Sequence, residues 1–125
     1  MYDDETTLAE LREIVRDFVD QREWQKFHSP KNLSMALAIE AAELMEHFQW
    51  ISMDASRQVG KDPDKLHAVG EELADVICYA LALSNSLNID VAAAVEAKML
   101  RNKKKYPAEE YRGRFGKQDP GADHC

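Results

Sequence analysis

Two pairs of carboxylates interrupt helical segments that are otherwise apolar. Glu40 and Glu43 form the first pair, and Glu72 and Asp75 form the second. Residues three apart on a helix project from the same face, so each pair presents two carboxylates side by side. Unpaired carboxylates facing a core are costly, but hard cations placed between them offset that cost and prefer oxygen ligands. The spacing therefore predicts the two halves of one metal site.

Two other interpretations of these carboxylates must be weighed. A single pair of this kind is most often a solvated helix face, because glutamate favours helices and charged residues mostly face water. A non-catalytic helical interaction module with a solvated acidic face is therefore the alternative. A di-iron carboxylate bundle requires Glu-x-x-His motifs, which neither pair supplies. Because two pairs lie within apolar runs, the metal site is favoured.

Composition indicates one globular domain. The chain has 125 residues, of which 45% are hydrophobic and 31% charged, as is ordinary for a single core. The net charge of -7 argues against binding to nucleic-acid polymers or anionic membranes. No transmembrane span or basic N-terminal segment is present, and the only cysteines are Cys78 and Cys125. We therefore expect a cytoplasmic protein without a structural disulfide.

Apolar residues recur at intervals of three and four, which predicts an all-α fold of four helices. The first two are expected over about residues 6–26 and 32–51, and residues 52–61 form a connection. The third begins with Asp62 as its N-cap and Pro63 at its first position, and the fourth runs from the Asp90 cap to about Lys105. A domain over residues 1–112 and a flexible tail over residues 113–125 follow.

The third predicted helix is apolar on nearly all sides. Between Leu73 and Leu83 its only charged residue is Asp75. Such a helix is expected to be buried all round, and three other helices cannot easily surround it in so short a chain. The pattern therefore favours a homo-oligomer in which a second subunit covers part of this helix.

Several short strings in a set order carry a resemblance to a known family. They are 22–24 (Arg-Glu-Trp), 27–33 (Phe-His-Ser-Pro-Lys-Asn-Leu), 40–46, 48–50 (Phe-Gln-Trp), 71–76 (Glu-Glu-Leu-Ala-Asp-Val), Tyr79, 98–99 (Lys-Met), Asn102 and 105–107 (Lys-Tyr-Pro). The chain resembles the all-α nucleotide pyrophosphohydrolases of the MazG-like superfamily, and the dCTP pyrophosphatase branch is the nearest. The resemblance covers nearly everything except the tail.

The resemblance implies a fold, an activity and a cofactor. The fold is a four-helix MazG-like bundle completed by oligomerisation, with a tetramer built as a dimer of dimers. The activity is hydrolysis of a nucleoside triphosphate, with dCTP or a modified pyrimidine deoxynucleotide expected, to a monophosphate and pyrophosphate. The implied cofactor is Mg²⁺, with Mn²⁺ as a substitute, held by Glu40, Glu43, Glu72 and Asp75.

Phosphoryl chemistry assigns expected roles to further residues. Glu43 and Glu46, one turn apart, are the candidates for positioning or deprotonating the attacking water, although a solvated helix residue is an equal interpretation of Glu46. Lys98 and Lys105 lie seven residues apart on one helix face, with Arg101 nearby, and could neutralise the departing pyrophosphate. The alternative is a solvated helix end stabilised by its cations.

Aromatic residues are candidates for holding the base. Trp50 and Tyr79 are expected to rise from the metal-bearing faces of their helices, where a base could stack between them, although core packing is the commoner role of such residues. The resemblance adds Trp24 and Asn102 as base or sugar contacts. The full set of expected substrate-binding residues is Trp24, Lys31, Trp50, Tyr79, Lys98, Arg101, Asn102, Lys105 and Tyr106.

Base selectivity is expected to depend on polar contacts. The Asn102 amide both donates and accepts, and so matches the amino and carbonyl groups of cytosine. Val15 departs from the pattern, because an apolar residue stands where the closest relatives are expected to read the base. For His28, in a Phe-His-Ser-Pro turn, a turn-stabilising role and a ligand-binding role both stay open.

Overall fold

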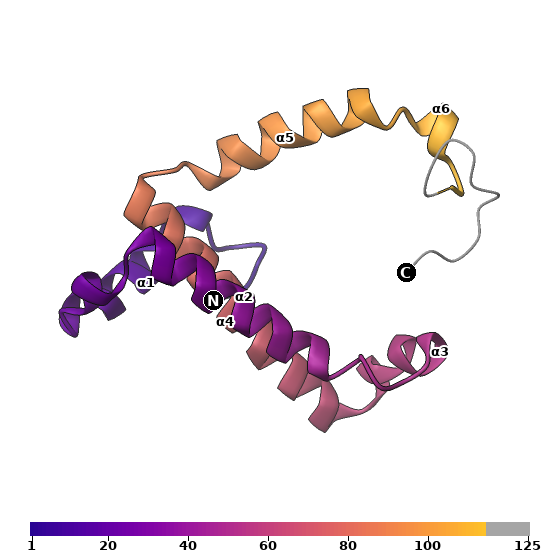
Figure 1. The fold of residues 1–125 in the computed structure, drawn as a ribbon, viewed down its shortest axis with the longest axis horizontal. Coiled ribbons are helices and arrows are strands. Elements are labelled where there is room, and N and C mark those ends of the chain that lie inside the picture. The colour runs from indigo at the N-terminus through magenta and orange to yellow at the C-terminus, as the bar shows by residue number, and fades with distance from the viewer. Residues whose placement is uncertain (115–125) are drawn as a thin grey trace. The chain divides into compact units, whose positions relative to one another are not determined.

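The computed structural model describes residues 1–114, and all regular secondary structure in that range is helical (Figure 1). This confirms the predicted all-α class. The chain divides into two compact units, Met1–Ile89 and Asp90–Cys125. The elements are α1 (Leu8–Gln21), η1 (Trp24–Phe27), α2 (Pro30–Glu46), α3 (Met53–Arg57), η2 (Val59–Lys61), α4 (Pro63–Leu87), α5 (Val91–Lys105) and α6 (Ala108–Tyr111).

The first unit is built on an antiparallel pair of helices, α2 and α4, which make the most extensive contact between elements (Figure 1). Helix α1 packs against α4. The most deeply buried apolar side chains come from all three helices: Val19 from α1, Leu33 from α2, and Leu81 and Ala82 from α4. This small core fixes the register in which the carboxylate-bearing parts of α2 and α4 face one another.

Side-chain caps and prolines explain where the two paired helices begin. Ser29 caps α2 by accepting a hydrogen bond from the backbone N–H of Asn32, and Pro30 occupies the first turn, where its missing N–H is not needed. The predicted cap of α4 is confirmed. Pro63 occupies the first position, and the Asp62 carboxylate accepts hydrogen bonds from the backbone N–H groups of Asp64 and Lys65. Helix α4 ends at Leu87, and its C-cap Asn88 has a left-handed φ of 55°.

Two of the predicted helices end earlier than expected. The first was expected to continue to about residue 26, but α1 ends at Gln21 because Glu23 adopts φ 52°, which a right-handed helix cannot accommodate. The second was expected to continue to about residue 51, but α2 ends at Glu46. There the backbone bonds from His47 to Leu44 and from Phe48 to Met45 tighten the chain into turns.

The connection predicted over residues 52–61 contains two short helices. Helix α3 is capped by Ser52, whose hydroxyl accepts from the backbone N–H of Ala55, and a single 3₁₀ turn, η2, follows it. Five- and three-residue helices are too short to produce a recognisable periodicity, so the sequence pattern indicated only a connection.

A polar network joins α1 to α4. The Asn85 side-chain oxygen accepts hydrogen bonds from Arg12 Nε at 3.0 Å and from Arg16 Nη2 at 3.2 Å, and its amide nitrogen donates to the Arg12 carbonyl at 3.0 Å. Arg16 also pairs with Glu13 at 2.8 Å. Both hydrogen-bonding functions of the half-buried Asn85 are thereby satisfied, which ties the C-terminal part of α4 to α1.

Within the first unit, residues 1–89, helix α4 is not covered on every side. Leu66, Leu73 and Ile77 are 51%, 47% and 43% exposed. The sequence predicted an all-round apolar helix, and the structure leaves these apolar side chains on one face of it partly exposed. No single helix within residues 1–114 is long and apolar enough to span a membrane, and α4 and α5 meet that test only when counted together across the break between them.

The second unit contains α5 and α6. Helix α5 begins after Asp90, whose carboxylate accepts from the backbone N–H of Ala93, so the predicted fourth helix and its cap are confirmed. The short helix α6 was not predicted, and the ring of Tyr111 packs edge-on against Tyr106 at a centroid separation of 5.2 Å. Most of the predicted flexible tail, residues 115–125, lies outside the described residues.

Candidate metal centre and adjoining pocket

Three carboxylates from two helices converge where α2 faces α4. Glu40, Glu43 and Glu72 each place one oxygen so that the three atoms lie within 4.8 Å of one another, and all three residues are half-buried. The structure thus brings together three residues from the two predicted motifs. Three oxygen donors at this spacing could surround one hard cation.

Asp75, the fourth predicted ligand, lies outside this group of three. Its side chain is exposed and lines the neighbouring pocket, one helical turn beyond Glu72. Its charge nevertheless contributes to raising the pKa values of Glu40 and Glu72, so Asp75 lies within electrostatic range of the cluster. The structure thus brings three of the four predicted ligands together and places the fourth beside them.

The three carboxylates disfavour full ionisation. Partial burial, followed by the neighbouring Glu43 and Asp75 carboxyls, raises the pKa of Glu40 from 4.5 to about 7. Burial and then the charge of Glu43 likewise raise the pKa of Glu72. The Oε2 atoms of Glu40 and Glu72 are buried and have no hydrogen-bond partner among the described residues. Orphaned carboxylate oxygens of this kind fit a divalent cation, which would satisfy them and relieve their repulsion.

A pocket of about 400 Å³ adjoins the carboxylates between α1, η1 and α4. Most of its wall is apolar, and polar side chains, among them His28, Asp75 and Tyr79, contribute to it. The remaining lining residues are Ile14, Val15, Phe18, Val19, Trp24, Cys78 and Ala82. A mostly apolar cavity beside a candidate cation site is suited to an aromatic ligand that carries an anionic group.

Trp24 is held in the pocket wall by its neighbours. The left-handed Glu23 reverses the chain after α1 and starts η1, so that the Trp24 ring meets Phe18 edge-on at a centroid distance of 5.6 Å. The Arg22 guanidinium lies 3.8 Å from the centroid of the Phe18 ring. Trp24 and Tyr79, both expected to contact substrate, therefore line the same pocket.

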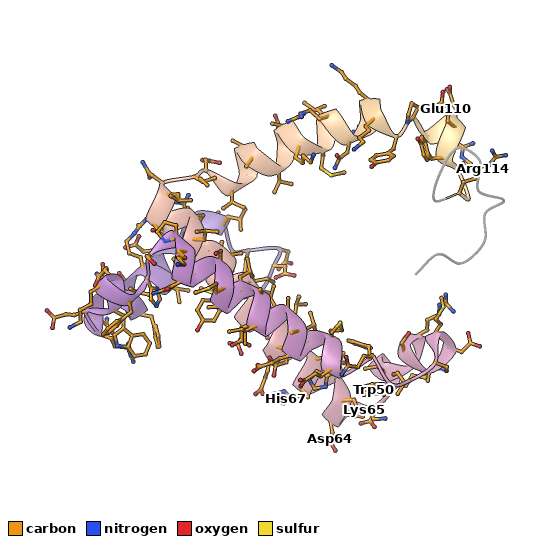
Figure 2. The ribbon with its side chains drawn as sticks, viewed as in Figure 1. Trp50, Asp64, Lys65, His67, Glu110 and Arg114 are labelled. Carbon is orange, nitrogen blue, oxygen red and sulfur yellow. The ribbon has the colours of Figure 1, made fainter. Side chains whose placement is uncertain are left out.

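Three other predicted residues lie outside both the carboxylate group and this pocket. Trp50 is 86% exposed on the connection after α2, and Figure 2 shows it at the end of the helix pair where Asp64 and Lys65 begin α4. Glu46 is exposed at the last position of α2, and Lys31 is exposed in its first turn. Within the part of the chain that the structure describes, these side chains therefore share no site with the carboxylates.

The remaining predicted substrate ligands belong to the second unit. Lys98, Arg101, Asn102 and Lys105 lie on α5, and Lys105 Nζ is 5.3 Å from the ring centroid of Tyr106. The Asn102 amide donates to the sulfur of Met99 at 3.8 Å. Their roles toward a substrate stay predictions.

Sequence reasoning missed several residues of the pocket. Ile14, Cys78 and Ala82 were not singled out, and His28 was left between two roles. A signal was present, because Cys78 and Ala82 lie three and seven residues beyond Asp75 and so continue its helix face. The packing of α1 across that face is a tertiary contact, which no local pattern specifies.

The model of the MazG-like family matches residues 35–115, most of the chain, including the three converging carboxylates and Asp75. This chain belongs to the MazG-like family. The resemblance seen in the sequence strings is confirmed. In a member of the MazG-like family, the acidic group is placed where a metal ion could be held.

Similar proteins of known name include dCTP pyrophosphatases. dCTP pyrophosphatase 1 of Homo sapiens is 39% identical over 104 residues, which cover 83% of this MazG-like chain and 61% of that protein. The Bos taurus protein of the same name is 36% identical over 112 residues, which cover 90% and 66%. This chain therefore spans less than two thirds of the length of these relatives.

A solved structure supports the same fold. The crystal structure of a pyrophosphatase from Archaeoglobus fulgidus is 39% identical and superposes with a TM-score of 0.74, covering 86% of this chain and 98% of that one. The fold is thus shared with a pyrophosphatase chain of similar length, whereas completion of the bundle by oligomerisation stays a prediction.

Proposed function

We propose that this protein is a Mg²⁺-dependent nucleoside triphosphate pyrophosphohydrolase, with Mn²⁺ as a substitute metal. Its proposed substrate is dCTP or a modified pyrimidine deoxynucleotide, cleaved to the monophosphate and pyrophosphate. The observation that carries this proposal is the convergence of Glu40, Glu43 and Glu72, with two orphaned oxygens, beside an aromatic-lined pocket. The names of the similar proteins support it.

The carboxylates and the pocket have different proposed roles in binding such a substrate. Glu40, Glu43 and Glu72 would hold the cation, with Asp75 beside them. Mg²⁺, when bound, supplies positive charge that offsets the repulsion between the triphosphate and an attacking water. Trp24 and Tyr79 offer ring faces to the base, and stacking of this kind tolerates any base.

Residues outside the pocket complete the proposed reaction. Glu46, one turn beyond Glu43, is proposed to position or deprotonate the attacking water, and Glu43 is the other candidate for this role. The cations of α5, Lys98, Arg101 and Lys105, offset charge on the leaving pyrophosphate, and Asn102 contacts the base. Lys31, Trp50 and Tyr106 are proposed as further substrate contacts.

The proposed setting is a homo-oligomer in the cytoplasm. The half-exposed apolar face of α4 supports assembly, as a tetramer made of two dimers, because a second copy would cover that face. No nucleic-acid polymer or membrane is a proposed partner, given the net charge of -7. Removal of unwanted nucleotides is the proposed role.

Pyrophosphate release from each of the four common deoxynucleoside triphosphates, with Mg²⁺ and then with excess chelator, tests the proposal. We expect metal-dependent release with a pyrimidine preferred. A preference for purines would reject the substrate class. The interaction module would instead be supported by two results together. No nucleotide would release pyrophosphate, and adding Mg²⁺ and nucleotide together would not change the melting temperature.

A further inference from the structure

The Arg22 side chain folds back over the end of α1. Its Nη1 atom donates to the Phe18 carbonyl at 3.1 Å, and its guanidinium carbon lies 3.8 Å from the centroid of the Phe18 ring. The backbone N–H of Arg22 donates to the Val19 carbonyl instead. One side chain therefore caps a carbonyl in the last turn of α1 and also covers the ring of the same residue.

The Phe18 ring is 48% exposed, so packing against the core does not by itself fix its orientation. An exposed ring on a helix can occupy more than one rotamer. A planar guanidinium is attracted to the face of such a ring, and it keeps its own hydrogen bonds while it is stacked there. The contact with Arg22 therefore favours one orientation of Phe18.

The orientation of Phe18 in turn favours one position of Trp24. The two rings meet edge-on with their centroids 5.6 Å apart, and both line the aromatic pocket. An edge-to-face contact depends on the angle between the rings, so a rotated Phe18 would lose it. Trp24 is itself 41% exposed, and it therefore relies in part on this contact for its place in the pocket wall.

A second cation–aromatic pair lies close by in the sequence and offers a comparison. Lys26 Nζ lies 5.2 Å from the ring centroid of Phe27, and Phe27 is not among the described residues that line the pocket. Lys26 and Arg22 are both exposed, and each carries one positive charge. The two pairs differ in whether the aromatic ring belongs to the pocket wall, which makes Lys26 a matched control.

We infer that Arg22 is a positioning residue for substrate binding, which acts through Phe18 to hold Trp24 where its ring can stack on the base. The inference rests on the proposed pyrophosphohydrolase function. Stacking stabilises the bound substrate and the transition state alike, so its loss weakens binding and leaves the chemical step unchanged. Because any base can stack, the effect should be similar for every nucleotide.

Steady-state kinetics of Arg22→Gln, Arg22→Lys and Lys26→Gln test this inference. We expect Arg22→Gln to raise KM for each deoxynucleoside triphosphate about fivefold, with kcat within about twofold, because an exposed cation–π contact and a hydrogen bond are lost. Arg22→Lys keeps the charge without the planar group and should recover part of the wild-type KM. Lys26→Gln should match the wild type. In a Phe18→Leu background, Arg22→Gln should have no further effect on KM.

A second readout requires no turnover. Trp24 and Trp50 are the two tryptophans of the chain, so Trp50→Phe leaves Trp24 as the sole one. In that background, Arg22→Gln should weaken the near-ultraviolet circular dichroism of Trp24, because this signal depends on fixed side-chain packing. Lys26→Gln should leave the signal unchanged.

The outcomes separate the inference from the proposed function. An unchanged KM in Arg22→Gln overturns the inference, and a weakened Trp24 signal beside it would assign Arg22 a structural role only. An equal effect of Lys26→Gln would indicate loss of charge alone and overturns it as well. A fall in kcat with KM unchanged also decides against it. If the wild type releases no pyrophosphate from any nucleotide, the proposed function itself fails, whatever the Trp24 signal shows.

Discussion

At the scale of single residues, adjacent glutamates on α4 lie in opposite environments. Glu72 is half-buried in the carboxylate group, whereas its neighbour Glu71 is exposed and paired with His67 at 3.0 Å. The two residues have the same chemistry and the same helix. A comparison of the two positions therefore separates the effect of the proposed cation site from the effect of removing a charge.

We expect Glu72→Gln to lower kcat/KM for the preferred nucleotide by on the order of 100-fold or more, because one anionic ligand of the cation is lost. Glu71→Gln is the control and should stay close to wild type. Steady-state pyrophosphate release at saturating Mg²⁺ measures both variants. Equal activity of the two variants would show that Glu72 is not a ligand of the cation.

The raised pKa of Glu40 predicts how the metal-free protein responds to pH. Its folded pKa of about 7 exceeds the ordinary value of 4.5, so folding favours the protonated form. The stability linked to this group is complete below pH 4.5 and is lost as the pH rises through about 7. Glu72, whose pKa is also raised, acts in the same direction.

The measurement is the melting temperature of chelator-treated protein between pH 5 and pH 8, for wild type and Glu40→Gln. We expect the melting temperature of the variant to rise relative to that of the wild type as the pH rises, because the amide carries no charge. Mg²⁺ added at pH 8 should stabilise the wild type more than the variant. A pH-independent difference between the two proteins would contradict the carboxylate repulsion.

Much of the site at this scale was predictable, for a physical reason. The spacing of Glu40 with Glu43, and of Glu72 with Asp75, follows from helix geometry alone. The pocket that Asp75 and His28 line depends on how α1 and η1 pack on α4. Such contacts join residues distant in sequence, and no local periodicity encodes them.

At the scale of elements, the helix starts were predicted better than the helix ends. Asp62 with Pro63, and Asp90, are local signals that act through a side chain and the first turn, and the structure contains both caps. The end of α1 depends on Glu23, which adopts a left-handed backbone conformation. Glutamate has no preference for that conformation, so the sequence does not indicate it. The apolar Trp24 and Phe27 continue the helical period beyond that point, which made the predicted helix too long.

The polar network between α1 and α4 makes a testable contribution to stability. Asn85→Ala removes both functions of the amide and leaves the Arg12 and Arg16 guanidinium groups without that partner. We expect the free energy of unfolding to fall by about 1–3 kcal/mol, measured by denaturant titration. Ser86→Ala, at the exposed neighbouring position, is the control and should change it by less than about 0.5 kcal/mol. Equal effects would show that the network does not bind α1 to α4.

At the scale of the whole molecule, the sequence predicted the all-α class and the family, because both follow from long periodic segments and ordered strings. The division into Met1–Ile89 and Asp90–Cys125 was not predicted. Residues 88–90 give only a cap signal in the sequence, and a cap marks the start of a helix without indicating which elements pack together. The predicted domain over residues 1–112 stays a prediction.

Assembly is the prediction that belongs to this scale. Light scattering coupled to size exclusion, at micromolar protein, should give a mass that is a multiple of the single chain, with four copies expected. Replacing Leu73 and Ile77 by glutamine should shift the mass toward the single chain, because both side chains are nearly half exposed on α4. The matched control replaces Val95 and Leu100, which are exposed on α5. A single-chain mass for the wild type would contradict assembly.

The open apolar face of α4 carries a consequence for how much protein is present. A chain that buries Leu66, Leu73 and Ile77 only against another copy gains part of its folding free energy by mass action. Each tenfold dilution then removes about 1.4 kcal/mol from every association step. If the chain assembles as proposed, its abundance also controls its stability, because a lower concentration of the chain destabilises each copy as well as reducing the number of copies.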